Sequence, residues 1–249
     1  DSLSIAQSQL LYGGIAAVST VLFLLLAREK PATPPCAAGE EVRALMLDGL
    51  KNALKIKEFW LYLGVCFIGM GIFNGVTTWV ENIVRPRGFS PSDAGTLGAL
   101  LLLGGVLGAV ILPSFSDKQH KRQKFIMIGV AFAIPGLVGL AFAQSAWLLY
   151  LSSFSLGFFL TSANPVGMQY IAEITYPTPE GTSAGLIQLF GQTSVVFVYI
   201  MEALQTRNGS FTVSLLFAVG LLMVAMLLIT GMKDPKREPG LTGSESVTP

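Results

Sequence analysis

The chain has 249 residues, of which 52% are hydrophobic and only 12% are charged, and its formal net charge is +1. Soluble domains carry about 25% charged residues because they must cover their surface with polar groups. The composition therefore excludes an ordinary soluble domain, and the small net charge gives no bulk attraction to nucleic acid. We expect a protein embedded in the lipid bilayer, with no nucleic-acid partner.

Seven apolar runs are long enough, or nearly so, to cross the hydrocarbon core of a membrane, which takes roughly 20 residues of helix. The runs are continuous and lack the alternation of barrel strands, so each predicts a helix. In chain order they are Leu10–Ala27, Phe59–Val84, Ala94–Pro113, Phe125–Ala143, Trp147–Tyr170, Thr182–Leu204 and Phe211–Met232. The sequence therefore predicts an all-α integral membrane protein with seven spans.

The start of the chain lacks the features of a signal peptide. Asp1 is the first residue, and neither a basic segment nor a small-residue cleavage site accompanies the first apolar run. We therefore interpret this run as a membrane span and the beginning of the sequence as a truncation.

A segment of different composition joins the first and second runs. Pro31, Pro34 and Pro35 break any helix there. After them, the segment Glu40–Lys57 has apolar residues near helical spacing and charges on the other face. The apolar positions are Val42, Leu45, Met46, Leu50, Ala53 and Leu54. The pattern predicts an amphipathic helix at the membrane surface, and a plain tether is the alternative.

The distribution of Lys and Arg predicts the orientation, because cytoplasmic loops carry an excess of both. One side holds thirteen of the sixteen basic residues, namely Arg28, Lys30, Arg43, Lys51, Lys55, Lys57, Lys118, Lys121, Arg122, Lys124, Lys233, Lys236 and Arg237. The other side holds Arg85, Arg87 and Arg207. The chain is therefore predicted to begin outside and to end in the cytoplasm, where residues 233–249 form a disordered tail.

The linker and one loop resemble the major facilitator superfamily, in which a long cytoplasmic linker joins two six-helix halves. The loop reads Asp117-Lys118-Gln119-His120-Lys121-Arg122, similar to the superfamily motif Asp-basic-x-Gly-basic-basic, with His120 in place of Gly. A solvated basic loop that fixes the topology is the alternative. The resemblance implies that residues 1–28 are the last helix of an N-terminal half, 29–58 the linker, and 59–232 the C-terminal six-helix bundle. The missing N-terminal half is then the expected partner.

A longer string resembles the feline leukaemia virus subgroup C receptor-related family within that superfamily. It runs from Gly157-Phe158-Phe159-Leu160-Thr161 through Glu173-Ile174-Thr175-Tyr176-Pro177 to Glu180-Gly181-Thr182-Ser183-Ala184-Gly185-Leu186. Gly71-Ile72-Phe73 and Val76-x-Thr78 add a weaker similarity. Members of the family are choline, ethanolamine or haem transporters, so the resemblance implies a small organic solute as the substrate.

Polar residues inside the apolar runs are candidates for the solute site, because an unpaired amide in hydrocarbon is costly and should face a partner or a wet cavity. The family binds its cation between the halves with aromatic faces and glutamines, and the resemblance aligns one such glutamine with Gln192 and a tyrosine with Asn74. Asn164 precedes Pro165, which removes a backbone hydrogen bond and leaves a carbonyl free to line a cavity. The expected substrate-binding residues are Gln192, Asn74, Asn164, Gln188 and Trp79. The alternatives are interhelical hydrogen bonds for the amides, a packing kink for the proline and an interfacial anchor for the tryptophan.

Acidic residues near the inner ends of the spans suggest a gate. Glu173 and Glu180 lie in a cytoplasmic loop that has no Lys or Arg of its own. We expect them to pair with Lys121, Arg122 or the amphipathic helix when the inside is closed. Asp117 of the loop motif belongs to the same predicted gating set. Ordinary solvation at the interface is the alternative.

Several signals of catalysis are absent from the sequence. There is no phosphate-binding loop of the Gly-x-x-x-x-Gly-Lys type and no His-Glu-x-x-His motif, and the sole histidine is His120. We therefore expect neither an enzyme nor a metal site, and no cofactor. The favoured interpretation is a secondary transporter that moves a small organic solute by alternating access. A non-transporting membrane receptor or assembly subunit, which would need no wet central cavity, is the alternative.

Overall fold

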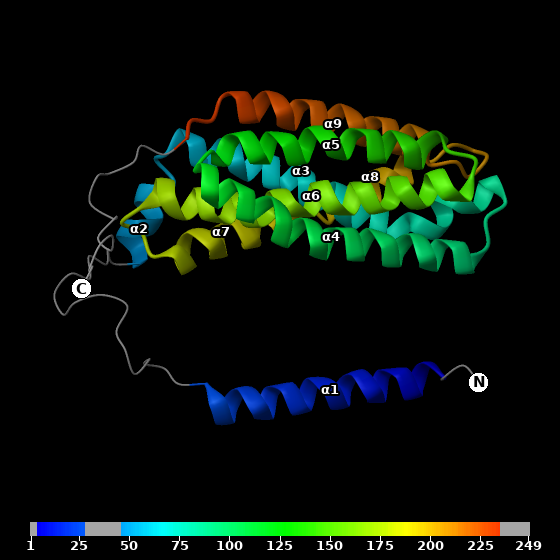
Figure 1. The fold of residues 1–249 in the computed structure, drawn as a ribbon, viewed down its shortest axis with the longest axis horizontal. Coiled ribbons are helices and arrows are strands. Elements are labelled where there is room, and N and C mark those ends of the chain that lie inside the picture. Colours follow the sequence, from blue (N-terminus) through cyan, green and yellow to red (C-terminus); the bar gives the residue numbers. More distant parts are fainter. Residues whose placement is uncertain (1–3, 28–45, 235–249) are drawn as a thin grey trace, which may run out of the picture. The chain divides into compact units, whose positions relative to one another are not determined.

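The computed structural model describes residues 4–27 and 46–234 of the chain (Figure 1). The chain divides into two units, Asp1–Val42 and Arg43–Pro249. In the first unit, helix α1 spans Ile5–Leu26 and begins with a capping box, in which Ser4 and Gln7 satisfy each other's backbone N–H groups. Its large apolar side chains are exposed on all sides, as is typical of a helix made to contact lipid or other helices.

The second unit is a helical bundle. Its elements in chain order are α2 (Met46–Ala53), α3 (Lys57–Val84), the 3-10 turn η1 (Arg85–Arg87), α4 (Pro91–Gln119), α5 (Arg122–Phe142), α6 (Ala146–Thr175), α7 (Glu180–Thr193), α8 (Val196–Ala203) and α9 (Thr212–Thr230). With α7 and α8 taken as one span and α1 included, seven described helical segments are long and apolar enough to cross a membrane. This confirms the predicted all-α membrane fold.

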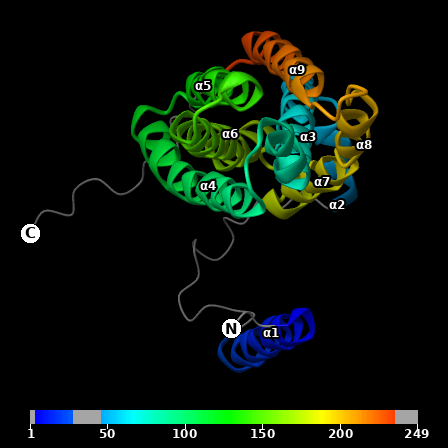
Figure 2. The ribbon, with the colours of Figure 1, turned by 90° about the vertical axis from the view of Figure 1, so that its right-hand side faces the viewer.

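Helix α6 lies in the interior of the bundle, beside α3, α4 and α5, as the end view in Figure 2 shows. Helices α6 and α4 pack closely because a glycine on each helix lies against the backbone of the other. A Cβ atom at Gly108 of α4 would meet the backbone of Phe158, and one at Gly157 of α6 would meet the backbone of Leu101. Without a hydrophobic driving force between helices in lipid, such small-residue contacts are a main source of packing energy.

Helix α4 begins and ends differently from the predicted run. Ser90 caps its N-terminus together with Asp93, and Pro91 occupies the first helical position, where its missing N–H costs nothing. The helix then continues through Pro113, the residue at which the apolar run ends. It stops at His120, whose backbone has a φ of 51°. This left-handed conformation at a helix C-cap is the one that glycine adopts most easily, which accounts for the glycine of the superfamily motif.

The sixth predicted span is present as Glu180–Ala203, but its helix is interrupted. It is divided at Ser194 and Val195 into α7 and α8. At the division the amides of Ser194 and Val195 bond to carbonyls three residues back, on Gly191 and Gln192. The Thr193 hydroxyl also donates to the Phe190 carbonyl at 2.6 Å. Threonine and serine hydroxyls compete with the helical ladder in this way, and the helix tightens into 3-10 turns.

Two short segments pack on the same end of the bundle (Figure 1). Helix α2 docks where α6 gives way to α7, with Ala53 fully buried and the Thr178 hydroxyl donating to the Gly49 carbonyl at 3.2 Å. Its predicted extension to residues 40–45 lies outside the described residues. After α9, the Asp234 carboxylate accepts from the Gln123 backbone N–H at 2.8 Å and so caps α5. The predicted tail is described only at residues 233 and 234.

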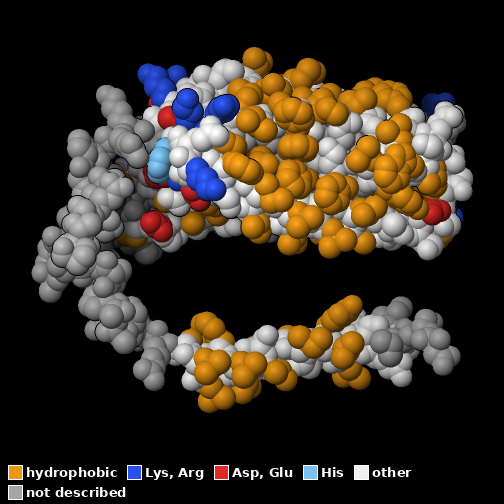
Figure 3. All heavy atoms as spheres, viewed as in Figure 1, with side chains coloured by type: hydrophobic (Ala, Val, Ile, Leu, Met, Phe, Trp, Pro, Cys, Tyr) orange, Lys and Arg blue, Asp and Glu red, His pale blue; other side chains and the backbone are white. Residues whose placement is uncertain are grey.

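Polar and apolar side chains separate along the bundle. Figure 3 shows an apolar belt over its middle, with charged side chains gathered at its two ends. One end, which we call the basic end, holds the junction of α4 and α5 with Lys118, Lys121, Arg122 and Lys124. The opposite end carries Arg85, Arg87 and Arg207. This is the division of charge expected of a bundle whose middle lies in hydrocarbon.

Candidate solute-binding site

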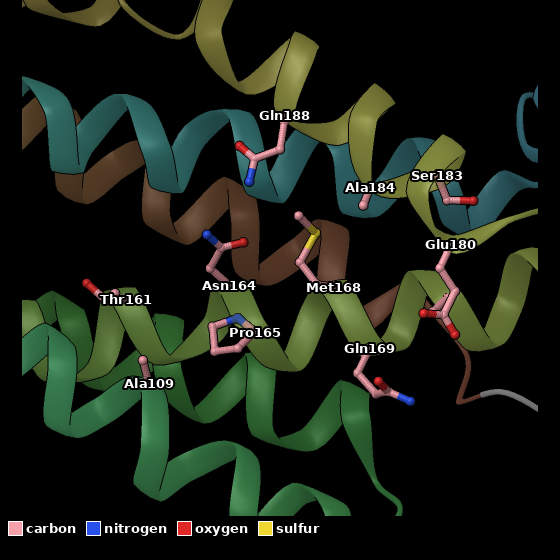
Figure 4. Close-up of a pocket in the computed structure, with 11 residues that line it drawn as sticks. Ala109, Thr161, Asn164, Pro165, Met168, Gln169, Glu180, Ser183, Ala184 and Gln188 are labelled. Carbon is pink, nitrogen blue, oxygen red and sulfur yellow. The ribbon is translucent and has the colours of Figure 1, made fainter. Parts of the chain in front are cut away.

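A cavity of about 520 Å³ lies between α6 and α7, with Ala109 of α4 on its wall (Figure 4). Asn164, Met168 and Gln169 reach it from α6, and Gln188 reaches it from α7. In Figure 4 the side chains of Asn164 and Gln188 point into the same space. The cavity extends from the middle of α6 toward the basic end, where Glu180 and Ser183 line it. Two of the predicted solute residues and one predicted gating residue therefore share one cavity.

Two polar atoms on its wall have no hydrogen-bond partner. They are Oγ1 of Thr161 and Oδ1 of Asn164, both removed from the protein surface and both on α6. Pro165 has no N–H, so the Thr161 carbonyl four residues earlier lacks its usual helical donor. Leaving a buried polar atom unpaired costs about 1–3 kcal/mol, so such atoms call for a water or a ligand.

A narrower cavity of about 260 Å³ runs along α3 on the other side of these residues. Tyr62, Cys66, Met70 and Phe73 of α3 form one wall, and α6 forms the other with Leu160, Thr161, Ala163 and Asn164. Thr161 and Asn164 line both cavities, so the two spaces meet at this pair. We call the first space the open cavity and the second the slot.

The remaining predicted solute residues lie in different places. Asn74 lines the slot and its amide donates to the Ser194 hydroxyl at 3.4 Å, beside the division between α7 and α8. Gln192 is exposed in the last turn of α7 and lines neither cavity. Trp79 also lies away from both. Its indole N–H donates to the Val198 carbonyl at 3.0 Å, and its ring lies 5.4 Å from that of Phe211, so it ties α3 to α8 and α9.

The predicted gating residues converge on Arg122 at the basic end. The Arg122 side chain is only 5% exposed and pairs with both Asp117 and Glu173. Its Nη2 atom lies 2.8 Å from Oε1 of Glu173 and its Nε atom 3.1 Å from the same oxygen, while Nη1 donates to the Ser116 hydroxyl at 3.1 Å. Gln169 donates to the same Glu173 oxygen at 3.2 Å. One buried guanidinium thus joins the ends of α4, α5 and α6.

The other two gating candidates are outside this cluster. Lys121 is exposed at the N-cap position of α5. Glu180 is exposed in the first turn of α7, where a carboxylate is favoured by the helix dipole, and it lines the open cavity. The structure therefore brings three of the five predicted gating residues into contact.

Comparison with known proteins supplies the family. A model of the Major Facilitator Superfamily matches residues 7–192 of the chain and, in a second match, residues 81–248. The chain belongs to the major facilitator superfamily. The family is one of membrane transporters, and the prediction made from the loop motif and the linker is confirmed.

Three relatives show which members of the superfamily the chain is similar to. The chain is 32% identical over 230 residues to an uncharacterized protein of Archaeoglobus fulgidus, covering 90% of this chain and 99% of that protein. It is 29% identical over 230 residues to the choline/ethanolamine transporter flvcr2a of Danio rerio, covering 85% of this chain and 49% of that protein. It is 34% identical over 212 residues to solute carrier family 49 member A3 of Danio rerio, covering 82% and 44%. The chain thus spans about half the length of these two Danio rerio relatives.

The sequence alone did not identify Thr161 as a candidate solute-binding residue. A threonine in an apolar helix is common, because its hydroxyl usually bonds back to a carbonyl of its own helix, as that of Thr77 does. One signal could have identified it. Pro165 stands four residues after Thr161, so the carbonyl of that threonine lacks its usual helical donor.

The described residues that line the two cavities carry amides, hydroxyls, apolar groups, a thiol and one carboxylate. Within the described residues there is no group of three or more His, Cys, Asp or Glu side chains placed to hold a metal ion.

Proposed function

We propose that this chain forms the C-terminal part of a secondary transporter that moves a small organic solute of the ethanolamine or choline kind by alternating access. The observation that carries the proposal is an open cavity beside the middle of the membrane-spanning helix α6, lined by the polar residues Thr161, Asn164 and Gln188. Two of these residues, Thr161 and Asn164, also hold a buried side-chain oxygen without a hydrogen-bond partner. Polar groups at this depth are expensive and are typical of substrate pathways. The two named transporter relatives support the same class of function.

The lining favours a solute with hydrogen-bond donors over one with carboxylates. Two side-chain oxygens on α6 are unpaired, and Glu180 adds a negative charge toward the basic end. Haem carries two carboxylates, and among the described residues that line the open cavity the one charged side chain is the acidic Glu180. Asn74 stands where the family resemblance has a tyrosine, which removes an aromatic wall suited to a quaternary ammonium. We therefore propose that a primary amine such as ethanolamine is preferred over choline.

The proposed topology follows from the charge distribution. The basic end faces the cytoplasm, because cytoplasmic loops collect Lys and Arg. The exposed Gln192 then belongs to the surface that a second, N-terminal half of the transporter covers, where it adds to the solute site. In this account the Arg122 cluster is part of the cytoplasmic gate, and Glu173 exchanges partners as the two halves rock.

Uptake of labelled solute tests the proposal. The longest chain that the gene encodes is expressed in cells that lack their own ethanolamine and choline uptake, and the initial rate is measured for both solutes. Asn164→Ala removes a proposed solute contact and is expected to lower uptake about ten-fold, the effect of one charge-assisted hydrogen bond. Asn208→Ala, in an exposed loop, is the matched control and should leave uptake unchanged.

Two results would contradict the proposal. Absence of uptake of either solute by a well-expressed, membrane-inserted wild type would remove the substrate assignment. Equal uptake by the wild type and Asn164→Ala would remove the open cavity from the pathway. Binding of a solute without uptake would favour the receptor alternative.

A further inference from the structure

The slot has a shape and a chemistry of its own. Its α3 wall runs from Tyr62 to Asn74, twelve residues on one helix, which corresponds to about 18 Å along the helix axis. Most of the wall is apolar or sulfur-bearing, and charged side chains are absent from the lining. Tyr62, Cys66 and Leu160 are each less than 9% exposed, so the inner part of the slot is shielded from bulk water.

Two buried, unpaired oxygens belong to residues of the α6 wall of the slot. Oγ1 of Thr161 and Oδ1 of Asn164 are unpaired on the α6 wall, where the slot meets the open cavity. The neighbouring Tyr62 hydroxyl already donates to the Asn164 carbonyl, at 3.4 Å. Water alone would satisfy the two oxygens but would gain little from the apolar remainder of the slot, because water needs two to four polar partners. A guest with one donor group and an apolar body fits both parts.

We propose that the slot is a second binding chamber for small uncharged amphiphiles of the primary-alcohol class. The hydroxyl group of the guest donates to the Thr161–Asn164 pair, and its alkyl chain extends along α3 past Cys66 and Gly69. The pair is the entrance from the open cavity. The chamber shares the Thr161–Asn164 pair with the proposed solute site, but binding in it requires neither the N-terminal half nor movement of a solute across the membrane.

A photoreactive alcohol tests the assignment. The full chain in lipid nanodiscs is irradiated with octanol that carries a diazirine on its third carbon, and the labelled residues are identified by mass spectrometry of peptides. The expected adducts lie on Tyr62 and Cys66, which line the slot. Straight-chain primary alcohols then compete for this labelling. Their potency should rise about four-fold per added methylene, the effect of burying one CH₂, until the slot is full.

Two variants separate the slot from the surrounding lipid. A Cβ atom at Gly69 would lie 3.8 Å from the nearest heavy atom, on Leu160, so Gly69→Ala fits without displacing a neighbour and fills part of the slot. It should shorten by about one carbon the longest alcohol that competes. Gly220→Ala adds the same methyl group in open space on α9 and is the matched control. Thr161→Val removes one acceptor at constant shape and should weaken competition about five-fold.

The outcomes decide the proposal. Adducts on Tyr62 or Cys66 that respond to Gly69→Ala and not to Gly220→Ala support the chamber. Adducts confined to lipid-facing residues such as Leu103 of α4 overturn it, as does labelling of the slot that no alcohol reduces. Equal competition by alcohols in Thr161→Val and the wild type would show that Thr161 is not the hydroxyl partner and would overturn the entrance assigned here. Because uptake is not measured, these results are independent of the proposed function.

Discussion

Removal of Glu173 should destabilise the bundle more than removal of Asp117, although both carboxylates pair with Arg122. The Arg122 side chain is 5% exposed, that of Glu173 is 29% exposed and that of Asp117 is 62% exposed. Glu173 accepts two hydrogen bonds from the guanidinium, at 2.8 and 3.1 Å. Its pair with Arg122 is therefore the less hydrated of the two, and it joins helices that are far apart in the sequence.

The magnitudes follow from this difference in exposure. Glu173→Ala removes both bonds and leaves a buried cation with one exposed partner, which should cost about 3 kcal/mol of the free energy of unfolding. Glu173→Gln keeps an acceptor oxygen but loses the charge, and should cost about 1–2 kcal/mol. Asp117→Asn changes a carboxylate that is mostly in water and should cost less than about 1 kcal/mol.

The assay is equilibrium unfolding of the purified chain in mild detergent, followed by circular dichroism at increasing denaturant. A double-mutant cycle with Arg122→Leu should give a coupling energy of about 2 kcal/mol with Glu173 and below about 1 kcal/mol with Asp117. The reverse order of the two couplings would refute the reasoning from exposure. In uptake measurements, exchanging the charges as Arg122→Glu with Glu173→Arg should restore part of the transport that each single variant loses, and no rescue would contradict the proposed gate.

Three further predictions concern the packing and the site. Thr161→Val should raise the free energy of unfolding by about 1 kcal/mol, because it replaces an unpaired oxygen with a methyl group, and it should weaken solute binding. A loss of stability in chemical denaturation would mean that the hydroxyl has a partner. Gly108→Ala should lower the free energy of unfolding by about 2 kcal/mol or more, because its Cβ would meet the Phe158 backbone. Gly98→Ala on the same helix has open space and should raise the free energy of unfolding by up to about 1 kcal/mol. Equal thermal midpoints for the two variants would contradict the close approach of α4 and α6. His120→Gly should stabilise by about 1 kcal/mol, because glycine adopts the φ of 51° without strain, and a lowered midpoint would show that the histidine side chain contributes more than its backbone costs.

Much of the fold could be predicted because lipid imposes a simple rule on sequence. An uninterrupted apolar run of about twenty residues has to be a helix when water cannot satisfy its backbone. Some helices begin or end at other residues than the apolar runs predict, for local reasons. Ser90 and Pro91 start α4 before its apolar run begins, and Pro113 is accommodated within the helix. The division at Ser194 was not predicted, because it depends on whether hydroxyls bond to the backbone of their own helix.

The candidate site was predicted in part. Amides in apolar runs identified Asn164, Asn74 and Gln188, which all line a cavity, since their burial without a partner is costly. The choice of Glu173 as the partner of Arg122 required the structure, because 51 residues separate the two and several basic residues were equally close in the sequence. Trp79 was a candidate only by residue type, and its place against Phe211 depends on how α3, α8 and α9 pack.

The central claim is that the open cavity beside Thr161 and Asn164 is a wet solute pathway, and the accessibility of a single cysteine tests it most directly. In a chain with Cys36→Ser and Cys66→Ser, Gln188→Cys places a thiol in the open cavity, and Val106→Cys places one on the 65% exposed apolar surface of α4 as the control. Both variants are treated in nanodiscs with a charged, water-soluble methanethiosulfonate reagent. The account predicts that Gln188→Cys reacts, that ethanolamine slows its reaction, and that Val106→Cys does not react. The same lack of reaction at both positions would show that the cavity is not open to water and would contradict the account.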